Sequence, residues 1–479
     1  MSTADDGPKP TAEASSGRTI QNLAPEIIDN IIHQVPEPGD LKSIRLVSKD
    51  LDAHARRKLF REVFLKPIDA TISRWNSTAD QPALSQVPRL AVIHTRENVE
   101  DEQDRSEYPR PGEAFRAALA ALSKFPKVDS LELTFTPECH GPESFLDVPE
   151  DHWQRLEILE WVFQAIKDRM DVPGTSKIRS LTLRNLQNFP YDGFPDSELF
   201  SSVMQQLEEL HVGLIQEYNE HGPDGDYDED ELLTFPPHFC SKWLQPIAPN
   251  LKALSVYSKV DNWGCFPGYF DPSAIVFPKL ETLSLGYYTI AHDDDLDWLL
   301  NNCKSLTTLV MHNCMIARCM LFDDSNIESW KVSTRDWQVV RRSDEYAHAE
   351  YMYNGRWSAF FDKIATALPN LREFRFDYIT TWDRETKNVY DVNNRQLGAA
   401  KAYAARYVAF NDGILPNRWP EAEVDGTIDD WYNCITDEAV GLPNFHMEAL
   451  EEDQKSLDRL LELCRARREA AGLGHSSAN

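Results

Sequence analysis

A run of alternating aspartates extends from Asp224 to Asp230 and is the stretch whose residue types come closest to a metal site. An EF-hand calcium loop also needs a glycine at its sixth position and a glutamate at its twelfth. Counted from Asp224, these positions hold Glu229 and Phe235, so a calcium site is not expected. The segment 217–231 has eight acids and neither lysine nor arginine. This pattern favours a solvated acidic loop, with electrostatic docking of a partner as the alternative.

Three cysteines and one histidine lie close together in the sequence, as Cys303, His312, Cys314 and Cys319. A structural zinc site takes four converging ligands, and its cysteines commonly come in closely spaced pairs. The chain contains no Cys-x-x-Cys pair. Cys314 fits a structural role at the end of an apolar pattern, and we expect His312 to point outward from its strand. No metal is expected here.

The remaining sequence offers no recognisable catalytic motif. It lacks Gly-x-Ser-x-Gly, His-Glu-x-x-His and a glycine-rich phosphate loop. A nucleophilic cysteine would need an adjacent base, and nothing selects one of the eight cysteines. We therefore expect no catalytic residues and no cofactor, although an enzyme within 315–441 is an alternative without a motif behind it. The chemistry expected is binding.

Composition narrows the class of partner. The chain has 479 residues, is 42% hydrophobic and carries a formal net charge of −29. This charge argues against nucleic acid and anionic membranes, which need a basic surface. It also argues against a pocket that reads phosphate on a target. There is no run of 18 apolar residues and no signal-peptide pattern. Scattered cysteines suit free thiols, so a cytoplasmic or nuclear location is expected.

Segment 20–66 contains three apolar patterns with helical spacing. Pro25 suits a first helical position, and Glu26 faces the positive end of the helix dipole. Three helices of this size bury too little surface to fold alone, so some of their apolar residues should contact another protein. The three sets are Ile27, Ile28, Ile31, Ile32 and Val35; Leu41, Ile44, Leu46, Val47 and Leu51; and Leu59, Phe60, Val63 and Phe64.

This segment resembles an F-box. The matching positions are Leu23-x-Pro25-Glu26, Ile31-Ile32, Asp40-Leu41, the run Ile-Arg-Leu-Val-Ser-Lys at 44–49, and Leu59-Phe60-Arg61. Two residues depart from the family pattern, because Ala24 stands where proline is usual and Leu51 where many members carry an aromatic residue. The alternative is a plain N-terminal helical hairpin. The whole chain resembles the F-box proteins with leucine-rich repeats that are common in filamentous fungi.

The resemblance implies a partner and a set of contacts. F-box helices bind the Skp-type adaptor of a cullin-RING (SCF-type) ubiquitin ligase, and the adaptor links them to the cullin. The adaptor-binding residues would be Leu23, Pro25, Glu26, Ile28, Ile31, Ile32, Leu41, Leu46, Val47, Ser48 and Leu51. We expect Pro25, Ile28, Ile32, Leu46 and Val47 to present one contiguous patch. A basic cluster, Arg56, Arg57, Lys58 and Arg61, is interpreted as a solvated helix face.

A second pattern, apolar-x-x-apolar-x-apolar, recurs seven times. It starts at positions 128, 178, 207, 251, 280, 306 and 371, and helix-like segments precede most copies at 115–122, 153–169, 198–206, 243–248, 296–302 and 358–368. This is the core of a leucine-rich repeat. The spacing is uneven, so we predict an α/β fold in which the three-helix F-box precedes an irregular leucine-rich-repeat solenoid. Its parallel strands would form one face and its helices the other.

The expected organisation follows from these patterns. Segments 1–19 and 471–479 are disordered tails, 20–66 is the F-box, and 67–127 is a linker with a poorly defined first repeat. The array covers 128–379, with insertions at 216–238 and 315–357, and an irregular extension covers 380–447. Segment 448–470 is a capping helix, with Leu450, Leu457, Leu460, Leu461 and Cys464 on one face. The second insertion holds Trp330, Trp337, Tyr346, Tyr351, Tyr353 and Trp357, interpreted as buried packing with target contact as the alternative.

The strands also predict a binding face. Side chains alternate along a strand, so the leucines should point inward and the intervening residues outward. An unidentified protein target would then contact Glu132, Thr134, Thr182, Arg184, His211, Ser255, Tyr257, Ser284, His312, Arg375 and Asp377. The expected function is a non-catalytic substrate-recognition subunit in ubiquitin-dependent degradation. The alternative is an interaction scaffold that is not coupled to ubiquitination.

Overall fold

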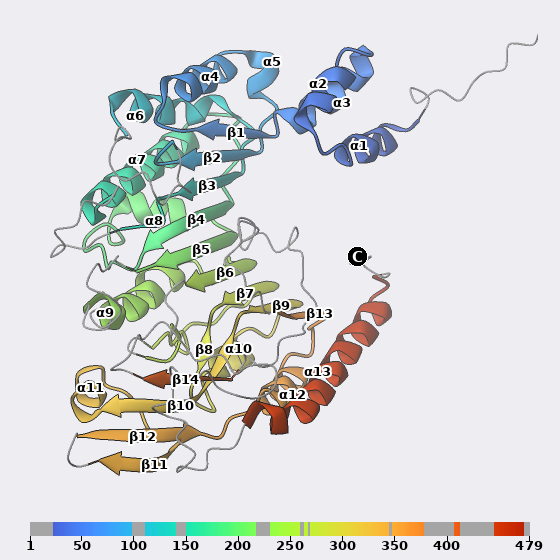
Figure 1. Ribbon diagram of the computed structural model, residues 1–479. Helices are drawn as coiled ribbons and strands as arrows, with labels where there is room; N and C mark the ends of the chain where they lie inside the picture. Colours follow the sequence, from blue (N-terminus) through green and yellow to red (C-terminus); the bar gives the residue numbers. More distant parts are fainter. Residues whose placement is uncertain are drawn as a thin grey trace, which may run out of the picture.

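A nine-stranded parallel sheet forms the body of the molecule in the computed structural model (Figure 1). The structure describes residues 23–97, 111–139, 150–216, 230–258, 263–266, 269–343, 347–377, 407–411 and 445–473. The strands follow one another across the sheet in chain order, with only β8 and β10–β12 left out between β7 and β13. They are β1 (Glu62–Leu65), β2 (Leu90–His94), β3 (Ser130–Thr134), β4 (Ser180–Gln187), β5 (Glu209–Ile215), β6 (Ala253–Ser258), β7 (Thr282–Gly286), β9 (Thr308–His312) and β13 (Glu373–Asp377).

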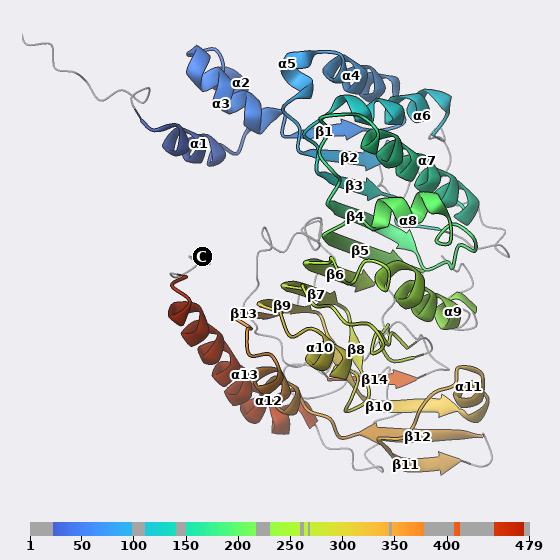
Figure 2. The same ribbon diagram turned by 180° about the vertical axis from the view of Figure 1, so that it is seen from behind.

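Helices connect most successive strands and pack against one face of the sheet, which is the face toward the viewer in Figure 2. Crossover helices are expected in such a sheet, because parallel neighbours need a long connection. The helices of the body are α4 (Asp69–Ala79), α5 (Pro82–Ser85), α6 (Glu113–Ala120), η2 (Ala121–Lys124), α7 (His152–Met170), α8 (Glu198–Met204), α9 (Asp230–His238), η4 (Phe239–Leu244), α10 (Asp297–Asn302) and α12 (Trp357–Ala367).

The seven predicted strands are all present, and the expected parallel pairing is confirmed. Leu131, Leu181, Leu283 and Leu309 are buried as predicted, in the layer between strands and helices. Neighbouring strands pair in register, so that Leu131 lies opposite Leu181. The repeated spacing in the sequence therefore produces stacked leucine rows, and these rows form the core.

Two strands of this sheet, β1 and β2, were not predicted. Val63 and Phe64 were assigned to a helical set, but helix α3 (Lys49–Leu59) ends before them and they lie in β1. The exposed and buried residues of β1 alternate, which is the period of a strand rather than a helix. Strand β2 pairs with both β1 and β3. The described residues of 67–127, predicted to be a linker with a poorly defined first repeat, are therefore part of the sheet body.

The N-terminal helices form a separate unit at one end of the sheet (Figure 1). They are α1 (Pro25–His33), α2 (Pro38–Ile44) and α3, so three helices are confirmed within the predicted segment. Their own small core consists of Ile28, Ile32, Leu41, Leu51 and Ala55. The main core starts at Val63 and continues to the C-terminal helix as one cluster.

The aromatic insertion folds into a second sheet. It contains β10 (Met315–Asp323), β11 (Trp337–Ser343) and β12 (His348–Tyr353), with the short helix α11 (Asp324–Ser329). Strands β8 (Thr289–Ile290) and β14 (Tyr407–Asn411) both pair with β10 in parallel. The predicted buried packing is confirmed for the aromatic residues whose positions are described, Trp330, Trp337, Tyr351, Tyr353 and Trp357, while Tyr346 lies outside the described residues.

Helix α13 (Phe445–Ala470) packs on α12 and on β13, the last strand of the nine-stranded sheet, as the predicted capping helix should. Leu457, Leu460 and Cys464 are buried, but Leu461 is 36% exposed, so its assignment to the packed face was wrong. Side chains one position apart on a helix point about 100° apart, and only one of Leu460 and Leu461 can face the core centre. The side chain of Leu450 lies outside the described residues.

Several predictions fall on residues outside the described ranges. These are the tail 1–19, most of the acidic segment, most of 380–447, and the end of the tail at 474–479. Asp230 and Glu231, the last two residues of the acidic segment, begin helix α9. Among the described helices, none is long and apolar enough to cross a membrane. The described cysteines are all free thiols, and six of these seven are buried.

Candidate functional site

The N-terminal unit is held together by a small core and by ionic contacts. Ser48 caps helix α3, where its Oγ accepts a hydrogen bond from the Leu51 N–H at 3.2 Å. Asp29 of α1 accepts hydrogen bonds from His54 and Arg57 of α3, and these contacts lower the pKa of the Asp29 carboxyl. The helices are therefore fixed relative to one another despite the small size of their core.

The basic cluster of α3 is more than a solvated face. Arg56 pairs with Asp52 and Arg57 pairs with Asp29. Lys58 donates from Nζ to the carbonyl oxygens of Ile32 and His33 at the end of α1, at 3.3 and 2.9 Å. A cation at a helix C-terminus interacts favourably with the helix dipole. Two of the four basic residues, Arg57 and Lys58, thus hold α1 on α3, and this structural role was missed in the sequence.

The predicted adaptor-binding residues divide into two groups. Ile28, Ile32, Leu41 and Leu51 are buried in the small core, so the prediction that Ile28 and Ile32 present a surface patch was wrong. The reason is that the three helices are too small to have a core without them. Leu23, Pro25, Glu26, Ile31, Leu46 and Val47 are exposed, and Ser48 is half-buried.

The exposed apolar residues of this unit are concentrated in two places. Ile27 and Ile31 lie one turn apart on α1, and Leu23 lies just before the N-cap of this helix. Leu46 and Val47 lie in the turn between α2 and α3, and they are 89% and 69% exposed. Leaving a leucine in water forgoes about 2 kcal/mol of transfer free energy. The fold gains nothing from this exposure, which is the property of a contact surface.

The predicted target-binding row is largely buried. Thr134, Ser255, Tyr257, Ser284 and His312 were expected to be exposed, and this was wrong because each is buried. The members that are half-buried are Glu132, Thr182, Arg184, His211 and Arg375. Asp377 ends β13, and its side chain lies outside the described residues. The outward face of the sheet is therefore not a row of free side chains.

Contacts between neighbouring strands explain this burial. Arg184 forms an ion pair with Glu132 at 2.7 Å, and His211 Nδ1 lies 2.8 Å from Ser255 Oγ. Parallel strands lie about 4.8 Å apart, so side chains in register, such as His211 and Ser255, meet directly, and the long Arg184 side chain reaches Glu132 diagonally. Polar residues on this face bond to one another across the strands.

Tyr257 shows why a large side chain can be buried here. Its register partners on the two neighbouring strands are Gly213 and Gly286. A β-carbon at Gly286 would overlap the Tyr257 ring. The ring lies along the sheet over this glycine, and its hydroxyl bonds to Ser284. The two glycines are the sequence signal that could have predicted this burial.

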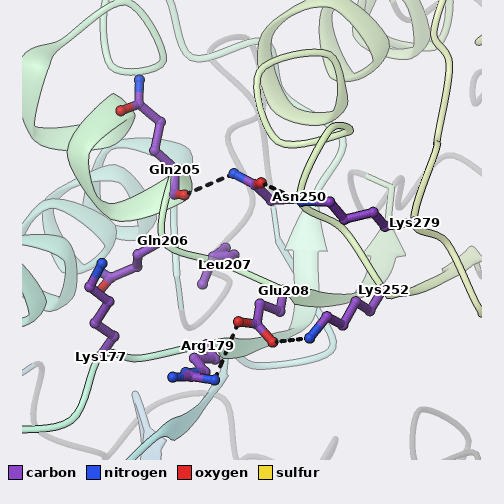
Figure 3. Close-up of a pocket in the computed structure, with 9 residues that line it drawn as sticks. All are labelled: Lys177, Arg179, Gln205, Gln206, Leu207, Glu208, Asn250, Lys252 and Lys279. Atoms are coloured by element: carbon purple, nitrogen blue, oxygen red, sulfur yellow. Dashed lines mark hydrogen bonds and ion pairs between the residues drawn. The ribbon is translucent and has the colours of Figure 1, made fainter.

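A cleft of about 370 Å³ opens at the amino ends of the strands (Figure 3). It is lined by the turns that lead into β4, β5, β6 and β7. Glu208 lies between two cations, 3.3 Å from Arg179 and 2.8 Å from Lys252, and the Lys252 hydrogen bond lowers the pKa of the Glu208 carboxyl. The lining residues are Lys177, Arg179, Gln205, Gln206, Leu207, Glu208, Asn250, Lys252 and Lys279.

These charged residues belong to a ladder along the amino edge of the sheet. The N–H of each residue just before a strand donates to the carbonyl of its equivalent on the preceding strand, as Glu208 does to Arg179 at 2.8 Å. Opposite charges alternate along most of the ladder, and such neighbours attract. The ladder residues are Arg89, Asp129, Arg179, Glu208, Lys252, Glu281, Thr307 and Arg372.

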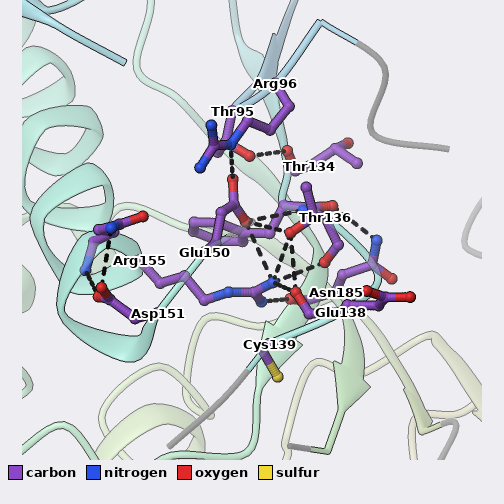
Figure 4. Close-up of polar contacts among 12 residues, drawn as sticks. Thr95, Arg96, Thr134, Thr136, Glu138, Cys139, Glu150, Asp151, Arg155 and Asn185 are labelled. Atoms are coloured by element: carbon purple, nitrogen blue, oxygen red, sulfur yellow. Dashed lines mark hydrogen bonds and ion pairs between the residues drawn. The ribbon is translucent and has the colours of Figure 1, made fainter. Parts of the chain in front are cut away.

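The opposite edge contains a buried ionic cluster (Figure 4). Arg155 of α7 donates to the carbonyl oxygens of Asn185 at 2.6 Å and Thr136 at 2.8 Å, and it lies 3.3 Å from Glu150. Glu150 in turn accepts from the N–H and hydroxyl of Thr136. Both charges are fully buried and committed to backbone partners. This cluster fastens α7 to the ends of β3 and β4, which is a structural role.

A second polar group lies beside the second sheet. His292 is buried and its Nδ1 is 3.2 Å from Asp336. Asp295 accepts hydrogen bonds from the backbone N–H groups of Ala291 and His292, at 2.7 and 2.8 Å. Burial raises the pKa of the Asp295 carboxyl to about 7 and lowers the pKa of His292. Both groups therefore titrate outside their ordinary ranges.

Among the described residues, the cysteines and acids do not assemble into a metal site. No group of three or more His, Cys, Asp or Glu residues within the described ranges is arranged to hold a metal ion. Burial raises the pKa of Cys303 to about 12 and that of Cys319 to about 11, so these thiols stay protonated near neutral pH. A protonated thiol is a poor metal ligand. Cys314 is buried at the end of β9, and its thiol lies near the Leu285 carbonyl.

No protein-family model matches the chain, and no curated protein matches its sequence. The family expected from the sequence motifs therefore stays a prediction. The function is argued below from the surfaces described above.

Proposed function

We propose that this chain is the substrate-recognition subunit of an SCF-type ubiquitin ligase, with α1–α3 as the F-box and the sheet body as a leucine-rich-repeat domain. The observation that carries the proposal is the exposure of Leu46 and Val47 outside a complete small core. They are part of the run at 44–49 that resembles the family. The partner of this surface would be the Skp-type adaptor, and through it the cullin.

The buried residues of the unit support the same role indirectly. Ile28 and Ile32 fix α1 so that Ile27 and Ile31 face outward. The ionic contacts of Asp29 and Lys58 keep α1 on α3. A rigid apolar surface binds with less entropic cost than one that must be ordered on binding. The unit thus has the preorganisation expected of a docking module.

The mechanism under this proposal is proximity. The chain would hold a target close to a ubiquitin carrier and raise its effective concentration there, without performing bond chemistry itself. Target contact would fall on the half-buried strand residues Glu132, Thr182, Arg184, His211 and Arg375, or on a surface outside this row. The alternative, a scaffold uncoupled from ubiquitination, would bind the adaptor without the cullin, or would bind nothing of the ligase.

The test is the double variant Leu46→Asp/Val47→Glu in the full chain. A charge placed in a desolvated interface costs several kcal/mol, and about 3 kcal/mol is already more than a hundredfold in affinity. Co-expression with a Skp-type adaptor and a cullin, followed by gel filtration, should show a complex for the wild type and none for the variant. Val276→Glu is the matched control, because Val276 is an exposed valine of the sheet body at 62%.

The possible outcomes separate the hypotheses. The proposal fails if the well-expressed wild-type chain binds neither protein. Binding of the adaptor without the cullin would indicate the scaffold. Equal loss of binding by the Val276→Glu variant would show that the effect does not come from the α2–α3 turn. Circular dichroism should show all three proteins folded, since the substituted side chains lie in water.

A further inference from the structure

The cleft at the amino edge of the sheet is built from equivalent positions of the repeated unit. Lys177 and Lys279 each stand immediately before the first apolar residue of a repeat, Ile178 and Leu280. Both lysines are exposed at the mouth of the cleft (Figure 3). The spacing of the pattern alone therefore brings these cations to one edge of the sheet.

The charges of the cleft do not cancel. Its lining contains four cations and one carboxylate. Arg179 and Lys252 share this carboxylate, which belongs to Glu208. Within the described residues, Lys177 and Lys279 have no carboxylate within 4.0 Å, and Lys279 contacts only the Asn250 side-chain oxygen at 3.3 Å. The cleft is thus a locally positive site in a chain whose formal net charge is −29. A local excess of this kind attracts anions.

The polar residues between the cations suit the same ligand. Gln205, Gln206 and Asn250 also line the cleft, and an amide group has two N–H donors, so Asn250 can donate to a carboxylate or phosphate oxygen as well as to the Gln205 carbonyl at 3.5 Å. Lysine and arginine form the stronger, charge-assisted bonds to these oxygens. Leu207 is the one apolar side chain in the lining. This surface is therefore too polar to serve as a hydrophobic docking groove.

The shape indicates a short chain rather than a single small ion. Lys177 precedes β4 and Lys279 precedes β7, so three strand spacings of about 4.8 Å separate their positions. That span of about 14 Å equals roughly four residues of extended peptide, at about 3.3 Å each. The volume of about 370 Å³ is at the lower end of ligand pockets, which is too small for a folded partner.

We propose that this cleft binds a short anionic segment of a partner protein, whose carboxylate or phosphate groups contact Lys177, Lys279 and the Arg179–Glu208–Lys252 group. The site lies on the sheet body and not on α1–α3, so it does not depend on adaptor binding. Its failure would leave the proposed ligase role untouched, and the converse also holds.

The test measures fluorescence anisotropy of labelled peptides with the purified full chain. The peptides are hexaglutamate, a glutamine peptide of the same length, and a peptide with two phosphoserines, and inorganic phosphate serves as a competitor. We expect both anionic peptides to bind, the glutamine peptide to bind at least tenfold more weakly, and binding to weaken as salt rises. Comparing hexaglutamate with the phosphoserine peptide distinguishes carboxylate from phosphate as the preferred group.

The variants locate the site. Lys177→Glu and Lys279→Glu should each weaken peptide binding roughly tenfold, because each replaces an attraction by a repulsion. Lys127→Glu is the matched control, since Lys127 is an exposed lysine at the equivalent position before β3, outside the lining of the cleft. Melting curves should coincide for all of these proteins, because the side chains are exposed.

Four results would overturn the proposal. The first is equal binding of the glutamine and glutamate peptides. The second is a loss on Lys127→Glu as large as that on Lys177→Glu, which would indicate a diffuse charge effect along the edge. The third is the absence of measurable binding of either anionic peptide at low salt. Competition by inorganic phosphate alone at the same concentration as the peptides would likewise contradict a peptide site.

Discussion

At the scale of single residues, the alternation of side chains along a strand correctly predicted which residues are buried against the helices, but it wrongly predicted that the residues on the other face are exposed. The leucines are buried as the pattern requires. The outer residues were expected in water, but parallel pairing stacks them on equivalents in the next strand, as with His211 and Ser255. A single strand carries no information about its register partner. The burial of the Tyr257 ring is indicated only by its register partners, Gly213 and Gly286, and these partners are known only once the strands are aligned.

A prediction at this scale concerns Asp295, whose pKa is raised to about 7 by burial. The folded state then holds a proton that the unfolded state releases near pH 4, so this carboxyl stabilises the fold at low pH and loses that effect as pH rises toward 7. One pKa unit is about 1.4 kcal/mol. Because the side chain is half-buried, we expect a change on the order of 2 kcal/mol between pH 4 and pH 8. Asp295→Asn should abolish it.

The measurement is urea unfolding of the wild type and the Asp295→Asn variant at several pH values. The amide keeps an oxygen that can accept from the Ala291 and His292 N–H groups. His292, Arg335, Asp294 and Asp336 are common to both proteins, so the part of their titration that does not depend on the Asp295 charge cancels in the difference. The variant should gain stability relative to the wild type as pH rises. A difference in unfolding free energy that is constant with pH would contradict the raised pKa.

At the scale of elements, the repeated strands and helices were predictable from the sequence, whereas the second sheet, which does not repeat, was missed. Seven strands and the helices before them follow one apolar pattern, so each copy supports the others. The second sheet contains no such copies, and the first four residues of β10 are buried without alternation. Such a run does not distinguish a strand from a buried helix. The exposed part of the α1–α3 surface was predictable from family motifs, whereas the basic cleft arises from residues 102 positions apart that only the sheet brings together.

Helix α13 occupies the place of one more helix in the stack. Arg467 donates to the Leu368 and Ala365 carbonyl oxygens at the last turn, at 2.8 and 3.1 Å. Arg169 of α7 makes the same kind of contact with the Phe125 and Val128 carbonyls at an earlier turn, at 2.6 and 2.7 Å. The capping helix thus repeats the contacts of an internal helix and closes the open end of the core.

This interpretation predicts different results for two adjacent leucines of α13. Leu460 is fully buried and Leu461 is 36% exposed. Leu460→Ala should lower the free energy of unfolding by about 2–5 kcal/mol, through lost transfer free energy and a cavity. Leu461→Ala should change it by less than about 1 kcal/mol. Urea unfolding compares the two, and equal effects would mean that α13 does not pack through the Leu460 face.

At the scale of the whole molecule, net charge was a poor guide to local charge. The value of −29 argued against a pocket that reads phosphate on a target, yet the amino edge of the sheet has a cleft with four cations. The alternating ladder holds two of these cations, Arg179 and Lys252, in place on a scaffold of backbone hydrogen bonds. Net charge sums over the whole chain, whereas the fold places charges of one sign together on separate surfaces. The buried apolar residues are also separated by the fold, into a large cluster and a small one.

The last prediction follows from this division of the core. The small cluster has five buried side chains and is not continuous with the main core. Units of about 40 residues are marginal without a partner, so α1–α3 should open at a lower free energy than the sheet. Hydrogen–deuterium exchange followed by mass spectrometry should show faster exchange in α1 and α3 than in β3–β7. Ile32→Ala should strongly raise exchange in α1–α3. A buried isoleucine-to-alanine substitution costs about 2–5 kcal/mol of unfolding free energy, which is more than so small a core can lose and stay folded.

The control is Leu283→Ala in β7, which removes a fully buried leucine of the main core. It should lower the melting temperature of the sheet, whereas Ile32→Ala should leave that temperature nearly unchanged. If α1–α3 and the sheet exchange at the same rate in the wild type, the two clusters unfold as one unit and the proposed independence is wrong. If the unit does open separately, a bound adaptor should slow its exchange, because any ligand that binds only the folded state stabilises it by mass action.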